Sequence, residues 1–263
     1  MTQTTDWTAR PHLDAARSSK VPQVTAVFWI VKILATTAGE TGGDALSMTL
    51  KLGYAVATLV FLAFFVVTLT VQVRASRYHP LAYWAVVVAT TTVGTTTSDF
   101  LDRTAGLGYV KSSALLLAAV IAVLVVWRVV AGRIEYEHIT GRRDEVFYWL
   151  AIVVSNTLGT ALGDFTASSA GLGFEGGALV FAGLLVLVAL VWRVSSRVPA
   201  AVLFWCAYVL TRPLGATLGD TLTKPHAEGG LALGRIAATL TMLVLMAVIV
   251  FAQTRRAARI RNR

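Results

Sequence analysis

The stretch Trp29-Ile-Val-Lys-Ile-Leu-Ala-Thr-Thr-Ala-Gly39-Glu-Thr-Gly-Gly43-Asp44 decides the fold, because the chain contains four copies of its pattern. Each copy runs from a Trp to an Asp fifteen residues later, with a Gly ten residues after the Trp and a small residue four positions beyond that Gly. An internal repeat of this kind sets the architecture before any single residue is interpreted. The other copies run from Trp84 to Asp99, from Trp149 to Asp164 and from Trp205 to Asp220.

Within each copy, the positions seven, eleven and fifteen residues after the Trp are mostly polar. These positions are one helical turn apart, so they form a single stripe on an otherwise apolar helix. Such a helix suits a polar pathway inside a bundle, and the small residues beside the stripe allow close packing of helices in lipid. The stripes are Thr36, Glu40 and Asp44; Thr91, Thr95 and Asp99; Asn156, Thr160 and Asp164; and Arg212, Ala216 and Asp220. The predicted packing residues are Gly39, Gly43, Gly94, Ser98, Gly159, Gly163, Gly215 and Gly219.

Composition identifies the class of protein. The chain has 263 residues, of which 56% are hydrophobic and 14% charged, and its mean hydropathy is +0.69. Apolar runs near 20 residues long indicate membrane-spanning helices and exclude a soluble domain. The single cysteine, Cys206, excludes an intrachain disulfide, and the polar first 20 residues do not resemble a cleavable signal peptide.

The pattern predicts an all-α polytopic membrane protein with eight transmembrane helices in four parallel two-helix repeats. Because each repeat has an even number of helices, all four insert the same way up. The repeats span 21–77, 78–133, 142–197 and 198–253, between an N-terminal tail at 1–20 and a basic tail at 254–263. The predicted helices are 22–43, 52–73, 80–98, 109–130, 146–163, 176–193, 199–219 and 231–252.

The distribution of positive charge predicts the orientation. Most of the 23 Lys and Arg residues border the Trp ends of the helices or lie in the two tails. The positive-inside rule therefore places both termini in the cytoplasm and the four Asp residues toward the outer side. Basic residues at helix ends also exclude nucleic acid as the partner of a chain with net charge +9. The expected partners are the lipid bilayer and a small ion or solute, and a homo-oligomer stays open.

The four tandem two-span repeats, each with a Trp, resemble a bacterial family of uncharacterised membrane-anchored proteins. Members of that family are built from four copies of a Trp-containing repeat of unknown function. The resemblance covers about residues 21–253, and the segment from Val21-Pro22-Gln23-Val24 to Asp44 is especially similar to the family's first repeat. It implies the repeat architecture and a bacterial inner membrane, and it implies no activity.

The four Asp residues have two interpretations. If the first helix of each repeat lies inside, the carboxylates form a ring or two facing pairs at one depth, where their oxygens suit hard cations or protons. Alternatively, each Asp is a repeated structural cap at a helix end. The candidate cation-binding or proton-coupling residues are Asp44, Asp99, Asp164, Asp220 and Glu40, and the candidate path-lining residues are Thr36, Thr91, Thr95, Asn156 and Thr160.

Two cations lie inside predicted helices. Arg212 aligns with Thr36, so it can reach Glu40 if repeats 1 and 4 are neighbours, as a static brace or as part of a gate. Lys32 is too far along its helix from Glu40 for direct pairing, and we expect its side chain to snorkel to the cytoplasmic interface. The residues Trp29, Trp84, Trp149 and Trp205 are predicted to form an aromatic belt at that interface.

The sequence contains no catalytic motif of a hydrolase, metalloprotease or zinc enzyme. We therefore expect no enzyme activity and no cofactor; the identity of any transported metal stays unknown. The leading hypothesis is a cation transporter, in one version exchanging a divalent metal for protons. The alternatives are an ion channel with an Asp ring and a non-transporting scaffold or sensor. The embedded cations also leave an anionic or zwitterionic solute open.

Overall fold

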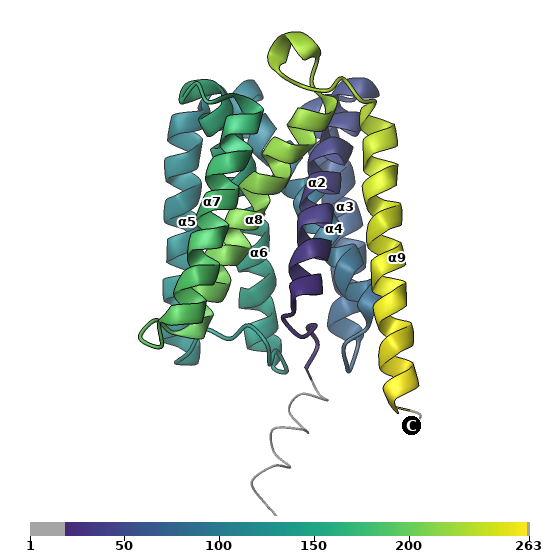
Figure 1. The fold of residues 1–263 in the computed structure, drawn as a ribbon, viewed down its shortest axis with the longest axis vertical. Coiled ribbons are helices and arrows are strands. Elements are labelled where there is room, and N and C mark those ends of the chain that lie inside the picture. Colours follow the sequence, from purple (N-terminus) through teal and green to yellow (C-terminus); the bar gives the residue numbers. More distant parts are fainter. Residues whose placement is uncertain (1–18, 262–263) are drawn as a thin grey trace, which may run out of the picture.

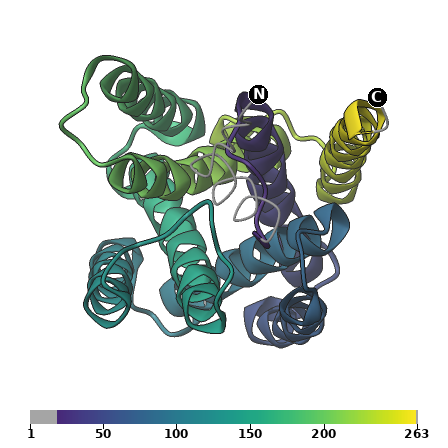
Figure 2. The same cartoon turned by 90° about the horizontal axis from the view of Figure 1, so that it is seen from below.

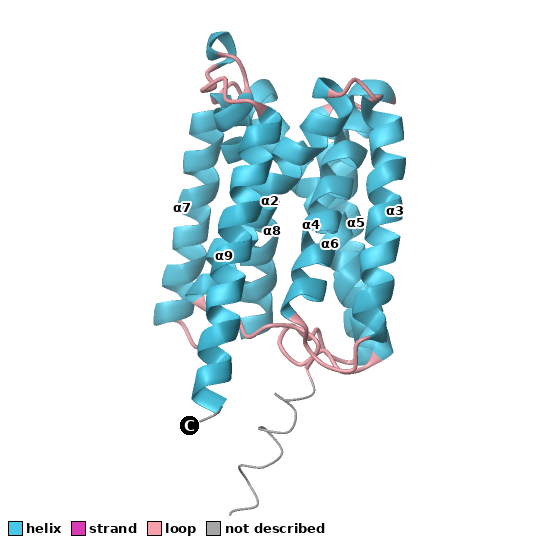
Figure 3. Ribbon diagram, turned by 90° about the vertical axis from the view of Figure 1, so that its right-hand side faces the viewer, coloured by secondary structure: helices cyan, strands magenta, loops and turns pink. Residues whose placement is uncertain are grey.

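The computed structural model describes residues 19–261, and within them the chain forms eight α-helices and no strand (Figures 1 and 3). The predicted tail at 1–20 lies almost wholly outside the described residues. One boundary differs clearly from the prediction, because the last helix runs well into the predicted basic tail, where neither Gly nor Pro interrupts it. The helices are α2 (Ala26–Asp44), α3 (Gly53–Arg74), α4 (Pro80–Asp99), α5 (Tyr109–Ala131), α6 (Arg142–Asp164), α7 (Gly173–Val194), α8 (Ala200–Thr223) and α9 (Arg235–Arg261).

The helices form two concentric layers (Figure 2). The first helices of the repeats, α2, α4, α6 and α8, form an inner ring in which each helix packs against its two neighbours. Each outer helix packs mainly on the inner helix of the next repeat: α3 on α4, α5 on α6, and α7 on α8. The last outer helix, α9, packs on α2 and closes the circle.

Glycines set the spacing of the inner ring. The Gly ten residues after each Trp faces the residue seven after the Trp of the next repeat, and repeat 4 faces repeat 1 in the same way. A Cβ at Gly94, for example, would lie 2.9 Å from the backbone carbonyl carbon of Asn156, so any side chain there would force the helices apart. The four contacts are Gly39 with Thr91, Gly94 with Asn156, Gly159 with Arg212, and Gly215 with Thr36.

The two layers differ in what they expose. The outer helices carry large apolar side chains on the outside of the molecule, as expected for contact with lipid acyl chains. Six of the described helices are long and apolar enough to cross a membrane: α3, α5, α6, α7, α8 and α9. The other two, α2 and α4, are buried in the inner ring and carry charged or threonine-rich faces. The chain is therefore a helical membrane protein with a polar interior.

The predicted aromatic belt is wrong for three of its four members. Trp84, Trp149 and Trp205 are buried inside one end of the ring, and only Trp29 is partly exposed. Each Trp precedes the first stripe residue by seven positions, which is two helical turns, so the register that turns the stripe inward turns the Trp inward as well. An aromatic residue before each Trp is also buried, and these four residues are Phe28, Tyr83, Tyr148 and Phe204. They close this end of the ring with ring-to-ring contacts.

Candidate functional site

The four Asp residues are buried at the opposite end of the inner ring from the aromatic cluster. In the first three repeats the α-helix ends at the Asp and continues as a five-residue π-helical turn. None of these three carboxylates accepts a capping hydrogen bond from the turn that follows, which argues against the cap interpretation.

Cations of the same chain bridge the Asp residues in two pairs. Arg103 Nε lies 3.2 Å from Asp99 Oδ1, and its Nη2 lies 3.5 Å from Asp164 Oδ2. The geometry therefore gives two facing pairs and not an open ring of carboxylates. In the other pair, Lys224 Nζ lies 3.2 Å from Asp220 Oδ1 and 3.4 Å from Asp44 Oδ2.

These bridging cations were not among the residues predicted from the sequence. Arg103 and Lys224 each follow an Asp by four residues, one helical turn, so the spacing could have revealed them. A third cation, Arg235 of α9, places Nε 3.3 Å from Asp44 Oδ2. Burial lowers the pKa of Lys224. The nearby carboxylates of Asp220 and Asp44 together raise this pKa by more than burial lowers it, so it lies above its ordinary value and the ammonium stays charged.

Deeper in the ring, Arg212 contacts residues from the three other inner helices. Its Nη2 donates to Glu40 Oε2 of α2 at 3.0 Å and to Thr160 Oγ1 of α6 at 2.7 Å. The same nitrogen also lies within hydrogen-bonding distance of Thr95 Oγ1 of α4, which competes for its two hydrogens. Arg212 is fully buried and Glu40 nearly so. The ion pair expected from the alignment of repeats 1 and 4 is therefore present, and it ties the whole inner ring together.

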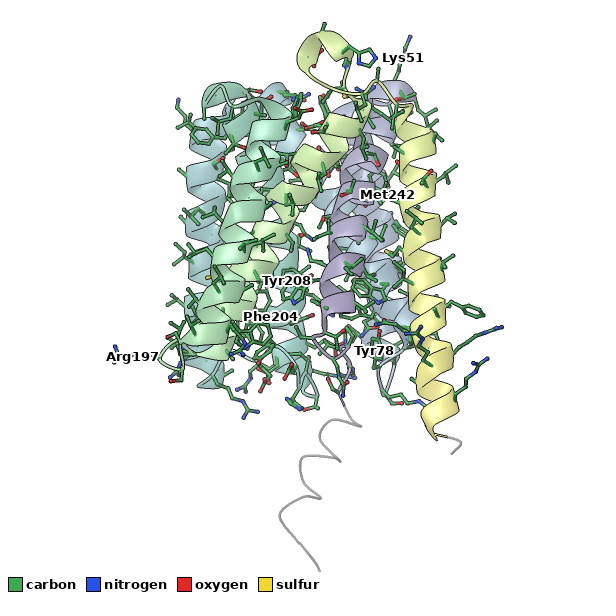
Figure 4. The ribbon with its side chains drawn as sticks, in the orientation of Figure 1. Lys51, Tyr78, Arg197, Phe204, Tyr208 and Met242 are labelled. Atoms are coloured by element: carbon green, nitrogen blue, oxygen red, sulfur yellow. The ribbon has the colours of Figure 1, made fainter. Side chains whose placement is uncertain are left out.

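The prediction that Lys32 snorkels to the cytoplasmic interface is wrong. Its side chain is completely buried, with Nζ 4.1 Å from the centroid of the Tyr208 ring. Figure 4 labels Tyr208 and Phe204 in the lower half of the bundle. The ring face attracts the ammonium, and this cation–π contact replaces water. Lys32 therefore belongs to the interior of the ring, one helical turn from the layer of Arg212.

The five predicted path-lining residues are all buried in the inner ring. Most of their polar groups are engaged with the protein itself. Thr36 and Thr91 donate to carbonyl oxygens of their own helices and of a neighbouring inner helix. Asn156 Nδ2 donates to Thr90 Oγ1 at 3.0 Å. In this state the stripe forms a closed polar core along the axis.

Comparison with known proteins identifies the family of the chain. The model of a repeat of unknown function, DUF347, matches residues 27–78, 82–133, 147–197 and 203–259, which together cover most of the chain. The chain belongs to the DUF347 repeat family. Its matched segments follow the four repeats of the structure, each with one inner and one outer helix. No curated protein matches the chain, and no solved structure matches it either.

The buried Asp and Glu residues of the inner ring are paired with Lys and Arg side chains. Within residues 19–261, no three His, Cys, Asp or Glu side chains come close enough together to hold a metal ion. At the Asp end of the ring, a cavity of about 450 Å³ is lined by both signs of charge, including Arg103, Asp164, Lys224 and Arg235. A divalent metal at the Asp residues would therefore have to displace cations of the protein.

Proposed function

We propose that this chain is a membrane transporter in which all eight helices cross the bilayer and a small charged solute moves along the axis of the inner ring. The observation that carries the proposal is the Arg212–Glu40 pair at the centre of four converging helices. Ionisable groups within membrane-spanning bundles are costly and usually mark solute, ion or proton pathways. Repeats related by an axis along the membrane normal are also common in transporters.

A carrier fits the interior better than an open channel. Aromatic side chains fill one end of the ring, and the Thr, Asn and Arg side chains meet across its centre. Movement of solute would require the inner helices to separate and the central pair to open. The cycle proposed here is therefore one of alternating access, with Arg212 and Glu40 as part of the gate.

The cation–proton version of the proposal assigns coupling to the outer Asp pairs. A cation or proton arriving at Asp99 and Asp164 competes with Arg103, which holds both carboxylates. Binding would then release Arg103 and loosen the contact between α4 and α6. This would link occupancy to opening of the outer end of the ring.

A non-transporting scaffold or sensor is the second candidate. The feature that favours it is the pairing of all four Asp residues with cations of the chain. In a scaffold these pairs would only lock neighbouring repeats together. The two candidates differ in whether any solute crosses the membrane.

Flux through proteoliposomes tests the proposal. Vesicles would contain a pH dye and a divalent-sensitive dye, with a voltage-sensitive dye outside, and salts of different cations and anions would be added. We expect a response in wild type that falls at least ten-fold in the double variant Asp99→Asn with Asp164→Asn. Glu175→Gln, an exposed carboxylate on α7, is the control and should transport like wild type. If no salt changes any dye, the transporter proposal fails and the scaffold is retained.

A further inference from the structure

The centre of the inner ring holds two buried basic side chains and one carboxylate. Lys32 and Arg212 are both 0% exposed, and Glu40 is the one carboxylate among the described residues at their depth. The remaining inward-facing residues at these levels are neutral. A buried ammonium or guanidinium without a counter-charge is strongly unfavourable, and a bound anion would supply that counter-charge.

Several buried donors at this level also lack acceptors. Within residues 19–261, Lys32 Nζ, Arg212 Nε and Nη1, and the Tyr208 hydroxyl have no hydrogen-bond partner. The same is true of Trp205 Nε1. Ammonium, guanidinium and indole groups only donate, so what they require is an acceptor. Buried polar groups are nearly always paired, and such an accumulation of free donors is unusual.

These donors are close together along two neighbouring helices. Lys32 Nζ of α2 lies over the Tyr208 ring of α8, and the Trp205 and Tyr208 rings are 5.5 Å apart. Arg212 lies one helical turn beyond Tyr208 on α8. We call Lys32, Trp205, Tyr208 and Arg212 the α2–α8 donor cluster.

The repeat architecture does not require this cluster. The positions equivalent to Lys32 and Tyr208 in repeats 2 and 3 are Val87 and Ile152, both buried. The ring therefore packs at this level with plain aliphatic residues on the other side. Trp205 is the Trp common to all four repeats, whereas Lys32, Tyr208 and Arg212 are additions confined to the contact between repeats 1 and 4.

We infer that the α2–α8 donor cluster binds a small monovalent anion, held between the Lys32 ammonium and the free nitrogens of Arg212. This deepens the proposed function, on which it rests for the role of the anion as transported solute or co-ion. One negative charge would balance a protonated Lys32, and a halide or a carboxylate accepts several hydrogen bonds at once. The Tyr208 hydroxyl would add a further donor.

Binding to the purified full chain in detergent tests the inference. Sodium chloride and sodium acetate are titrated against sodium gluconate at equal ionic strength, and tryptophan fluorescence is recorded because Trp205 belongs to the cluster. We expect a saturable change with chloride, acetate or both, which identifies an inorganic or a carboxylate ligand, and none with the bulkier gluconate. Absence of a saturable change with both probes overturns the inference.

Variants locate the site. Lys32→Met should weaken binding at least ten-fold, while Lys32→Arg should retain it and Lys111→Met, an exposed lysine on α5, should match wild type. Tyr208→Phe keeps the ring under Lys32, so it should fold even if Lys32→Met does not, and we expect it to bind a few-fold more weakly. Unchanged affinity in both Lys32→Met and Tyr208→Phe would place the anion elsewhere and refute the assignment.

Measuring both anion binding and solute flux into vesicles tests the anion site and the proposed transport function independently. Anion binding that depends on Lys32 without movement of any solute into vesicles would retain the site and reject the transporter. Cation flux in a protein that binds neither chloride nor acetate would retain the transporter and reject the anion site. Saturable binding together with flux of the bound anion would support both.

Discussion

Two helix contacts in the inner ring, α8 with α2 and α4 with α6, are related by the repeat pattern and differ only in part. At the Asp end they are similar, because Lys224 bridges Asp220 and Asp44 as Arg103 bridges Asp99 and Asp164, although Arg235 adds a second cation to Asp44. At the centre they diverge, because the α8–α2 contact carries Lys32, Arg212 and Glu40 where the α4–α6 contact carries neutral residues, Ile152, Thr91 and Thr160. The comparison indicates that repetition builds the ring and its four Asp residues. The bridging cations occur only in repeats 2 and 4, and the buried charges at the centre occur only in repeats 1 and 4.

The largest effect is expected at the centre of the α8–α2 contact. Arg212→Met leaves Glu40 buried without its partner, so we expect the free energy of unfolding to fall by about 3–5 kcal/mol. The equivalent change in the α4–α6 contact, Thr91→Val, removes a hydroxyl hydrogen bond and should cost about 0.5–1.5 kcal/mol. Denaturant unfolding in mixed micelles measures both. Equal losses at the two positions would remove the asymmetry on which the comparison depends.

Glycine contacts are expected to give the next largest effect, because both helix contacts depend on the same spacing. Gly94→Ala places a Cβ against the backbone at Asn156 and should destabilise by about 1–3 kcal/mol. Gly183→Ala on α7 meets nothing within 4 Å, so the gain in helix propensity should stabilise by up to about 1 kcal/mol. Thermal unfolding in detergent distinguishes the two signs. A neutral Gly94→Ala would show that the ring can widen freely.

The smallest effects are expected at the bridges at the Asp end, where the two contacts are similar. Arg103→Gln and Lys224→Gln should each cost about 1–2 kcal/mol, between the values for buried and for surface pairs. The pair of the exposed Arg133 with the partly buried Glu135 provides a control, and Arg133→Gln should cost at most about 0.5 kcal/mol. A large difference between Arg103→Gln and Lys224→Gln would sharpen the comparison by extending the asymmetry to the Asp end.

Much of the fold could be predicted because the repeat aligns equivalent residues in four helices. The position of Arg212 one turn from the level of Glu40 was enough to predict their ion pair. The bridging of Asp residues was missed because Arg103 and Lys224 looked like loop cations, and the π-helical turns that extend the helices leave no sequence signal that we recognised. The prediction for Trp84 and Lys32 followed the general preference of Trp and Lys side chains for the membrane interface. The helical register of these two residues, which turns them toward the ring, explains their burial.

The contact between α9 and α2 has a consequence for biosynthesis. Thr41 of α2 and Thr239 of α9 place their hydroxyl oxygens 2.8 Å apart although 198 residues separate them in sequence. One side of an early helix thus remains uncovered until the ribosome has produced α9, and long-range contacts of this kind form slowly. Because every outer helix packs mainly on the following repeat, an isolated repeat lacks most of the cover for its inner helix. Assembly is expected to proceed by successive docking and to finish only when the last helix reaches the first.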